Sequence, residues 1–169
     1  MKIYPETLPH PDNRHLEAAE GWLGLGNWNE AGGELDQISD EYAAHPHVLE
    51  MRYKIFGASK QWDKAVEIGL LAREIFPDQP WGHFYAAFAL HELKRTREAY
   101  DTLRPVIAKF PEEQIMCYNL ACYACQLGQL EEAMDWFQQS VRIEGKNDVR
   151  KLALDDKDLE PLWSRIKTM

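Results

Sequence analysis

An alanine recurs every 34 residues along most of this chain of 169 residues, and this period constrains the fold more than any other feature. The four positions are Ala31, Ala65, Ala99 and Ala133. Each alanine follows a charged residue, and a bulky or β-branched residue lies three positions before it. Sequence periods of about 20–50 residues are typical of chains that stack one small structural unit on the next. The sequence therefore predicts a stack of four similar units.

Each unit is predicted to consist of two helices joined by a turn. Glycine or lysine marks this turn, at Gly26, Lys60, Lys94 and Gly128. In the last unit, apolar residues recur three or four positions apart, the spacing of one helix face, at Leu130, Ala133, Phe137 and Val141. Pro77 and Pro111 follow the second helix of their units, and proline ends helices because it lacks an amide proton. No segment alternates apolar and polar residues as a strand does, so we expect no sheet.

The pattern resembles the tetratricopeptide repeat, a helix–turn–helix unit of about 34 residues. The match is strongest in the last unit, where Tyr118-Asn119-Leu120-Ala121-Cys122-Tyr123 leads to Gly128, Ala133 and Phe137. The resemblance implies an all-α fold, a right-handed α-solenoid of antiparallel helix hairpins with four repeats and C-terminal capping helices. Pro5, Pro9 and Pro11 favour an extended N-terminal arm at 1–11. We expect the repeats over 12–145 (approximately 12–45, 46–79, 80–113 and 114–147) and a cap at 146–169.

Several residues depart from the repeat pattern. Tyr53 replaces a small residue, and Gly69 replaces a large one, so we expect the Tyr53 ring to fill the space that Gly69 leaves. Gly32 and Gly33 lie inside the second helix, where they either permit close backbone packing or weaken the helix. Pro105 is predicted to kink the helix that starts near residue 96.

Composition and charge exclude several functional classes. The chain is 45% hydrophobic, but no apolar run approaches the roughly 18 residues of a membrane span. Its net charge is −9, and residues 1–50 hold 10 acidic residues against 2 basic ones. Such a chain is a poor candidate for binding nucleic acid or an anionic membrane. Three cysteines close together and no apolar N-terminal stretch favour a cytoplasmic protein.

The cysteines Cys117, Cys122 and Cys125 are the strongest candidates for chemistry. Their spacing matches three of the four ligands of a plant-type iron–sulfur site, and the last two have the spacing of a redox or zinc pair. The chain has no fourth cysteine, however, and the segment is predicted to be helical. We therefore expect small packed side chains, with a thiol or metal-dependent protein as the less favoured alternative. No phosphate loop or nucleophile motif is found, so no catalytic residue, cofactor or metal is predicted and the chain is not expected to be an enzyme.

In this family the first helix of each repeat lines a concave groove that binds ligands. The resemblance implies that the groove residues here are Glu17, Glu20, Glu50, Met51, Lys54, Trp81, Phe84, Tyr85, Phe88, His91, Tyr118, Asn119 and Cys122. The four aromatic residues in this set form a stripe on one predicted helix, and such a stripe is usually core. That helix has a second apolar side, at Ala86, Ala87 and Leu90, that suits its hairpin partner. We therefore expect at least two of the rings to be exposed, unless the chain's own ends fill the groove.

These observations favour a non-enzymatic protein–protein interaction module that binds a peptide or helical segment in an aromatic-lined groove. Carboxylates at Glu17, Glu20 and Glu50 suit a partner segment that carries apolar anchors and a nearby lysine or arginine. The alternative is a self-associating scaffold, for example a homodimer. The sequence does not identify the partner.

Overall fold

The structure, a computed structural model, describes residues 4–169 apart from the side chains at 146 and 147. The chain forms two compact units, unit 1 (Met1–Ala89) and unit 2 (Leu90–Met169). Every regular element among residues 4–169 is a helix, so the predicted all-α fold is confirmed.

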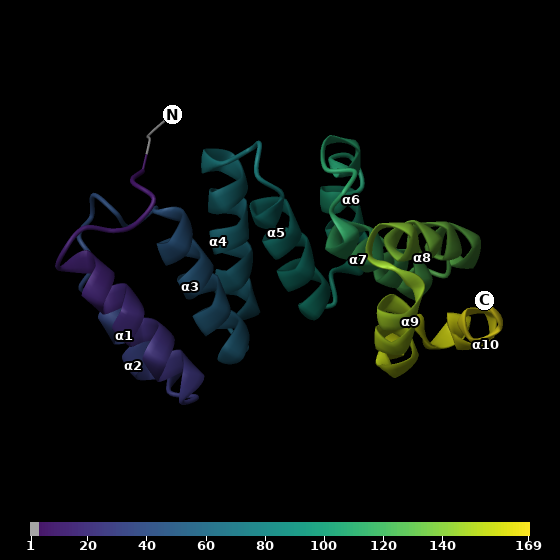
Figure 1. The fold of residues 1–169 in the computed structure, drawn as a ribbon, viewed down its shortest axis with the longest axis horizontal. Helices are drawn as coiled ribbons and strands as arrows, with labels where there is room; N and C mark the ends of the chain where they lie inside the picture. The colour runs from purple at the N-terminus through teal and green to yellow at the C-terminus, as the bar shows by residue number, and fades with distance from the viewer. Residues whose placement is uncertain (1–3) are drawn as a thin grey trace. The chain divides into compact units, whose positions relative to one another are not determined.

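Unit 1 holds two complete helix pairs and most of a fifth helix. Its helices are α1 (Asp12–Gly24), α2 (Trp28–Leu35), α3 (Pro46–Ala58), α4 (Trp62–Ile75) and the start of α5 (Pro80–Glu92). Helix α1 packs against α2, and α3 packs against α4, as Figure 1 shows. A core cluster joins the first pair to α3, with contributions from Leu8, Ala19, Ala31, Leu35, Ile38, Val48, Met51 and Ile55.

Unit 2 holds one long helix pair and a C-terminal group of short helices. After the end of α5 come α6 (Thr96–Leu103), η1 (Ile107–Lys109), α7 (Gln114–Gln126), α8 (Leu130–Glu144), α9 (Lys146–Asp155), η2 (Lys157–Leu162) and α10 (Trp163–Thr168). Helix α7 packs against α8 on one side and against η2 on another. Leu159, Leu162 and Ile166 are fully buried, which is how the C-terminal group covers the apolar surface of the pair.

The same turn joins the two helices of each pair, four times over. The residue predicted to mark it has a positive φ each time: +77° at Gly26, +56° at Lys60, +63° at Lys94 and +77° at Gly128. In each turn the backbone N–H of the next residue donates to the carbonyl five positions earlier, at 2.8–3.0 Å. The four bonds run from Asn27 to Trp22, from Gln61 to Phe56, from Arg95 to Leu90 and from Gln129 to Ala124. This left-handed ending satisfies free carbonyls at the end of the first helix. The period in the sequence is therefore also a period of backbone conformation.

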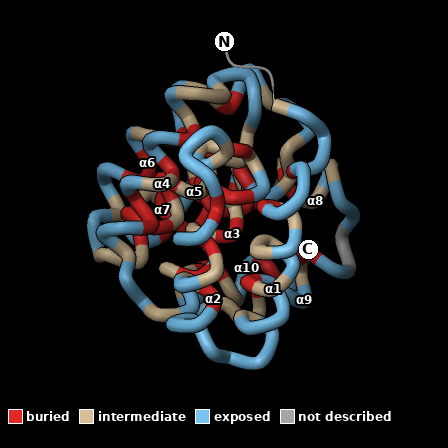
Figure 2. Tube along the Cα trace, turned by 90° about the vertical axis from the view of Figure 1, so that its left-hand side faces the viewer, coloured by how far each residue is buried: buried red, intermediate tan, exposed pale blue. Residues whose placement is uncertain are grey.

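The alanines that define the repeat are all fully buried, as is typical of close helix crossings. Figure 2 shows the buried residues concentrated on the helices, with many of the connecting turns exposed. Helices α4 and α5 approach each other closely, because a Cβ built on Gly69 would lie 2.4 Å from the Ala86 nitrogen. The prediction that Tyr53 fills the space beside Gly69 is therefore wrong, because the backbone of α5 occupies that space.

Two local predictions are decided by the structure. Pro105 does not kink a helix, because α6 already ends at Leu103 and only the short η1 follows. The prediction that Gly32 and Gly33 permit close backbone packing is also wrong, since a Cβ on either glycine would have no heavy atom within 4 Å. These two glycines leave α2 without the stabilisation that alanine would give it.

Candidate protein-binding site

An aromatic row on α5 is the main feature of the predicted groove within unit 1. It consists of Trp81, Phe84, Tyr85 and Phe88, which are all partly buried. Neighbouring rings touch along the row: the centroids are 5.7 Å apart for Trp81 and Tyr85, 5.6 Å for Phe84 and Tyr85, and 6.0 Å for Phe84 and Phe88. The other side of α5 is fully buried at Ala86, Ala87 and Ala89. The row is therefore neither core nor free surface.

Rings from the neighbouring helices hold this aromatic row in place. Tyr53 on α3 stacks on Tyr85, with the centroids 3.9 Å apart and the planes at 9°. Trp62 on α4 meets Phe88 edge-on at 6.0 Å. Burial, followed by the negative charge of Glu50, raises the pKa of Tyr85 to about 12, so this phenol stays neutral at physiological pH. Packing of this kind fixes the exposed edges of the rings in one arrangement.

The charged groove residues of unit 1 are exposed. Glu50 and Lys54 form an ion pair of 2.7 Å one turn apart on α3, and both side chains are nearly half exposed. Glu17 and Glu20 on α1 are exposed. Met51 is different, because it is buried in the core cluster beside α1 and α2 and presents no surface to a partner.

The N-terminal arm covers part of the predicted face of unit 1. His45 Nε2 donates to the Pro5 carbonyl at 2.9 Å, and the Tyr4 ring lies edge-on to the His45 ring. Leu8 is buried in the core cluster. A small cleft of about 130 Å³ remains between the arm and the first helices, lined by Glu6, Thr7, Leu8, Asn13, Leu16, Glu17 and His47.

In unit 2 the predicted groove residues lie beneath the chain's own C-terminal segment. His91, Tyr118, Asn119 and Cys122 are all buried. Asp156 and Asp158, which flank the start of η2, accept hydrogen bonds from Tyr118 and His91, respectively, at 2.9 and 2.8 Å. The expectation that these four residues line an open groove is therefore not met. The sequence predicted a C-terminal cap, but it gave no signal for which helix the two carboxylates would meet.

The three cysteines are free and buried on α7. Burial raises the pKa of Cys117 and Cys122, and nearby carboxylates at Asp156 and Asp158 raise that of Cys122 further. The pKa of Cys125 is raised to about 11. The reactive thiolate is thus disfavoured at neutral pH. Within the described part of the chain, no group of three or more His, Cys, Asp or Glu side chains is placed to hold a metal ion.

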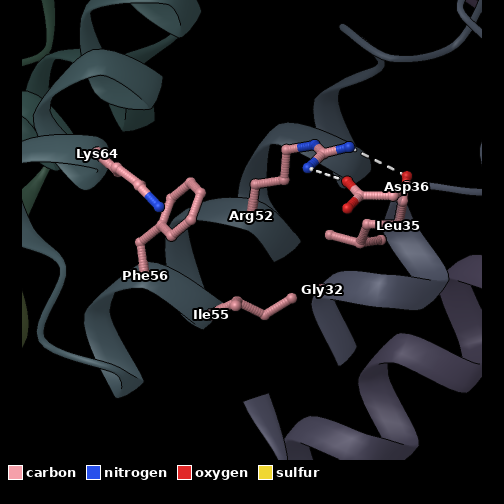
Figure 3. Close-up of a pocket in the computed structure, with 7 residues that line it drawn as sticks. All are labelled: Gly32, Leu35, Asp36, Arg52, Ile55, Phe56 and Lys64. Carbon is pink, nitrogen blue, oxygen red and sulfur yellow. Dashed lines mark hydrogen bonds and ion pairs between the residues drawn. The ribbon is translucent and has the colours of Figure 1, made fainter. Parts of the chain in front are cut away.

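Sequence reasoning missed a cleft of about 210 Å³ between α2, α3 and α4 (Figure 3). Arg52 spans one side of it, donating to Asp36 Oδ1 at 3.1 Å and to the Leu35 carbonyl at 3.0 Å. Lys64 lies 5.4 Å from the centre of the Phe56 ring. Both cations thus already have partners within unit 1.

No described helix is both long and apolar enough to cross a membrane. No protein-family model matches the sequence, and neither does any curated protein. Among solved structures, "MamA 41-end from Desulfovibrio magneticus RS-1" matches with a TM-score of 0.74 and 17% identity, over 96% of this chain and 94% of that one.

Two further matches agree on the fold. A crystal structure of MamA protein has a TM-score of 0.72 and 13% identity, and covers 93% of this chain and 88% of that one. The structure "MamA AMB-1 P212121" has a TM-score of 0.62 and 21% identity, over 86% and 79% of the two chains. At such identities the likeness establishes the fold alone. The chain therefore has a helical-repeat fold of the tetratricopeptide kind, similar to that of MamA.

Proposed function

We propose that this protein is a non-enzymatic binding module for a segment of another protein, and that the aromatic row on α5 is its main contact surface. The supporting observation is that Trp81, Phe84, Tyr85 and Phe88 are partly exposed on a helix whose other side is fully buried. Rings fixed by their neighbours bury large apolar area on binding at little entropic cost. Aromatic residues of this kind are typical hot spots of protein interfaces.

The partner segment has apolar side chains for the rings and a lysine or arginine beside them. Glu17 and Glu20 supply negative charge on α1 in unit 1, and Glu50 on α3, which pairs with Lys54, lies near enough to Tyr85 to raise the pKa of its hydroxyl. Charge of one sign near an apolar surface selects partners of the opposite sign and speeds their association. An extended or helical segment satisfies both requirements.

A displayed library of short random peptides, selected on the whole protein, tests this proposal. We expect the selected peptides to combine an aromatic or aliphatic anchor with a basic residue. The double variant Trp81→Ala/Phe88→Ala should weaken their binding about tenfold or more in fluorescence anisotropy. The matched control is Leu70→Ala/Leu71→Ala, which removes two exposed leucines of α4 in the same unit. Equal binding by both double variants, with their helical circular dichroism intact, would contradict the proposal.

Self-association is a second candidate function, and one surface of unit 1 favours it. Trp22, Leu25 and Trp28 surround the turn between α1 and α2 and are 38%, 78% and 42% exposed. Large apolar side chains gathered on a surface are typical of interaction sites, and two copies can bury them in a symmetric dimer. Light scattering over a concentration series tests this: we expect twice the chain mass of 19.6 kDa for the native protein and a monomer for Leu25→Glu. A monomer at every concentration would exclude it.

A further inference from the structure

The segment Asp156-Lys157-Asp158-Leu159 lies against α7 in unit 2, and polar side chains make much of the contact. Asp156 Oδ2 accepts from the Tyr118 hydroxyl at 2.9 Å and from the Cys122 thiol at 3.6 Å. Gln126 Nε2 donates to the Asp158 carbonyl at 2.9 Å. Since Tyr118, Cys122 and Gln126 follow one another at four-residue intervals, they form a single stripe of donors along α7.

Each carboxylate of the segment has its own set of donors. Asp156 uses Oδ1 to accept from the Asp158 backbone N–H at 2.9 Å, which leaves Oδ2 directed at α7. Asp158 Oδ2 accepts from His91 Nε2 at 2.8 Å. His91 in turn bonds through Nδ1 to the Thr96 hydroxyl at 3.0 Å, so its ring is oriented by a second contact. The segment is therefore bound through two carboxylates that are two residues apart.

The donors on α7 are suited to carboxylates over a wide pH range. Burial, followed by nearby negative charge, raises the pKa of the Tyr118 hydroxyl and of the Cys122 thiol, so both keep their protons. The hydrogen bond from His91 lowers the pKa of Asp158, so this acceptor stays charged. An apolar contact completes the set, because Leu159 is fully buried directly after the second carboxylate.

The C-terminal segment does not use every donor on this helix. Asn119, the neighbour of Tyr118, is buried, and its Nδ2 has no hydrogen-bond partner among the described residues. A buried amide without a partner is unfavourable.

From these contacts we propose that this stripe of α7 is a binding site for a short acidic protein segment, with two carboxylates two residues apart and an apolar residue after the second. Residues 156–159 occupy the site as an internal ligand. This inference rests on the proposed function and adds to it, because it assigns unit 2 a partner of opposite charge to the partner of unit 1. A competing acidic segment binds when the C-terminal segment is released.

The test uses a fluorescent peptide of residues 154–169 and the full-length chain carrying Asp156→Asn/Asp158→Asn, which weakens the internal ligand. We expect the peptide to bind this double variant about tenfold or more tightly than it binds the native chain, whose site is filled. A peptide with asparagine at both positions should lose that binding. Asp155→Asn is the matched control, since Asp155 is an exposed neighbour at the end of α9. If the two peptides bind the double variant equally, or if neither binds, the proposal is overturned.

Hydrogen exchange on the native chain gives a second measurement, which also decides the question should the double variant fail to fold. We expect the amides of residues 156–163 to exchange through a local opening during which α7 and α8 stay protected. If these amides exchange only on global unfolding, the C-terminal segment is an integral part of the core, and the proposal is overturned. Adding Trp81→Ala/Phe88→Ala to the Asp156→Asn/Asp158→Asn chain separates the two sites. If the acidic peptide still binds and the basic peptides bind as well as before, the result counts against the proposed function alone.

Discussion

Gly69 and Gly82 lack a side chain because α4 and α5 meet backbone to backbone. A Cβ on Gly69 would lie 2.4 Å from the Ala86 nitrogen, and one on Gly82 would lie 2.6 Å from the Arg73 nitrogen. Backbone cannot move aside as a flexible side chain can, so Gly69→Ala should lower the free energy of unfolding by about 2–3 kcal/mol. Gly33→Ala, in open space on α2, should raise it by about 1 kcal/mol. Urea unfolding of both variants checks the pair, and a loss at both positions would contradict the argument.

Asp158 makes the stability of the chain depend on pH. The hydrogen bond from His91 lowers the pKa of this carboxyl in the folded state, so its contribution is present above the unfolded value of about 3.9 and is lost as the pH falls through the folded value. Asp158→Asn should therefore lower stability at neutral pH and flatten the acid limb of the stability curve. Urea midpoints measured from neutral pH down to about pH 2 check this, with Asp155→Asn as the control. An unchanged acid limb in Asp158→Asn would contradict the linkage.

At the scale of the elements, the four turns are built alike but do not contain the same residue. Lys60 and Lys94 adopt the left-handed conformation that Gly26 and Gly128 adopt freely. In this conformation a residue with a Cβ is less stable than glycine by about 1–2 kcal/mol. Part of this difference is offset, because glycine also increases the conformational entropy of the unfolded chain. Lys60→Gly should therefore raise the free energy of unfolding by about 0.5–1 kcal/mol. Lys64→Gly, inside α4, should lower it by about 1 kcal/mol, and thermal unfolding that ranks the two variants the other way would refute the argument.

The elements that follow the period could be predicted from the sequence, because each depends on residues close together in the chain. The turn at Gly128 and the burial of Ala133 are examples. The close approach at Gly69 could not be predicted, since the size of a residue does not reveal which neighbour fills the space beside it. The end of α6 before Pro105 was missed for a related reason: proline permits either a kink or a stop, and the surrounding packing decides.

At the scale of the whole molecule, the sequence did not predict how open each part of the candidate site is. The predicted face of unit 1 includes exposed and partly exposed residues, such as Glu20 and Trp81. The predicted face of unit 2 is buried, because Asp156 pairs with Tyr118, 38 residues away in the chain. A contact over that separation depends on how the C-terminal helices return to α7. No local pattern in the sequence encodes such a return. The sequence therefore could not show whether this face of α7 is covered by the chain's own end or by a separate ligand.

The uneven charge of the two units predicts how binding responds to salt. Residues 1–89 hold 14 acidic and 7 basic residues, whereas residues 90–169 hold 14 and 12. Because exposed charges are screened beyond about 8–10 Å at physiological salt, raising the salt from about 50 to about 500 mM should weaken the basic peptides selected for unit 1. The double variant Glu17→Lys/Glu20→Lys should weaken the binding of these peptides several-fold at low salt without loss of thermal stability. The control Glu67→Lys, at an exposed position on α4, should have a much smaller effect on binding. Anisotropy titrations at both salt concentrations check this. If the affinity changes neither with salt nor with the double charge reversal, the rings alone select the partner.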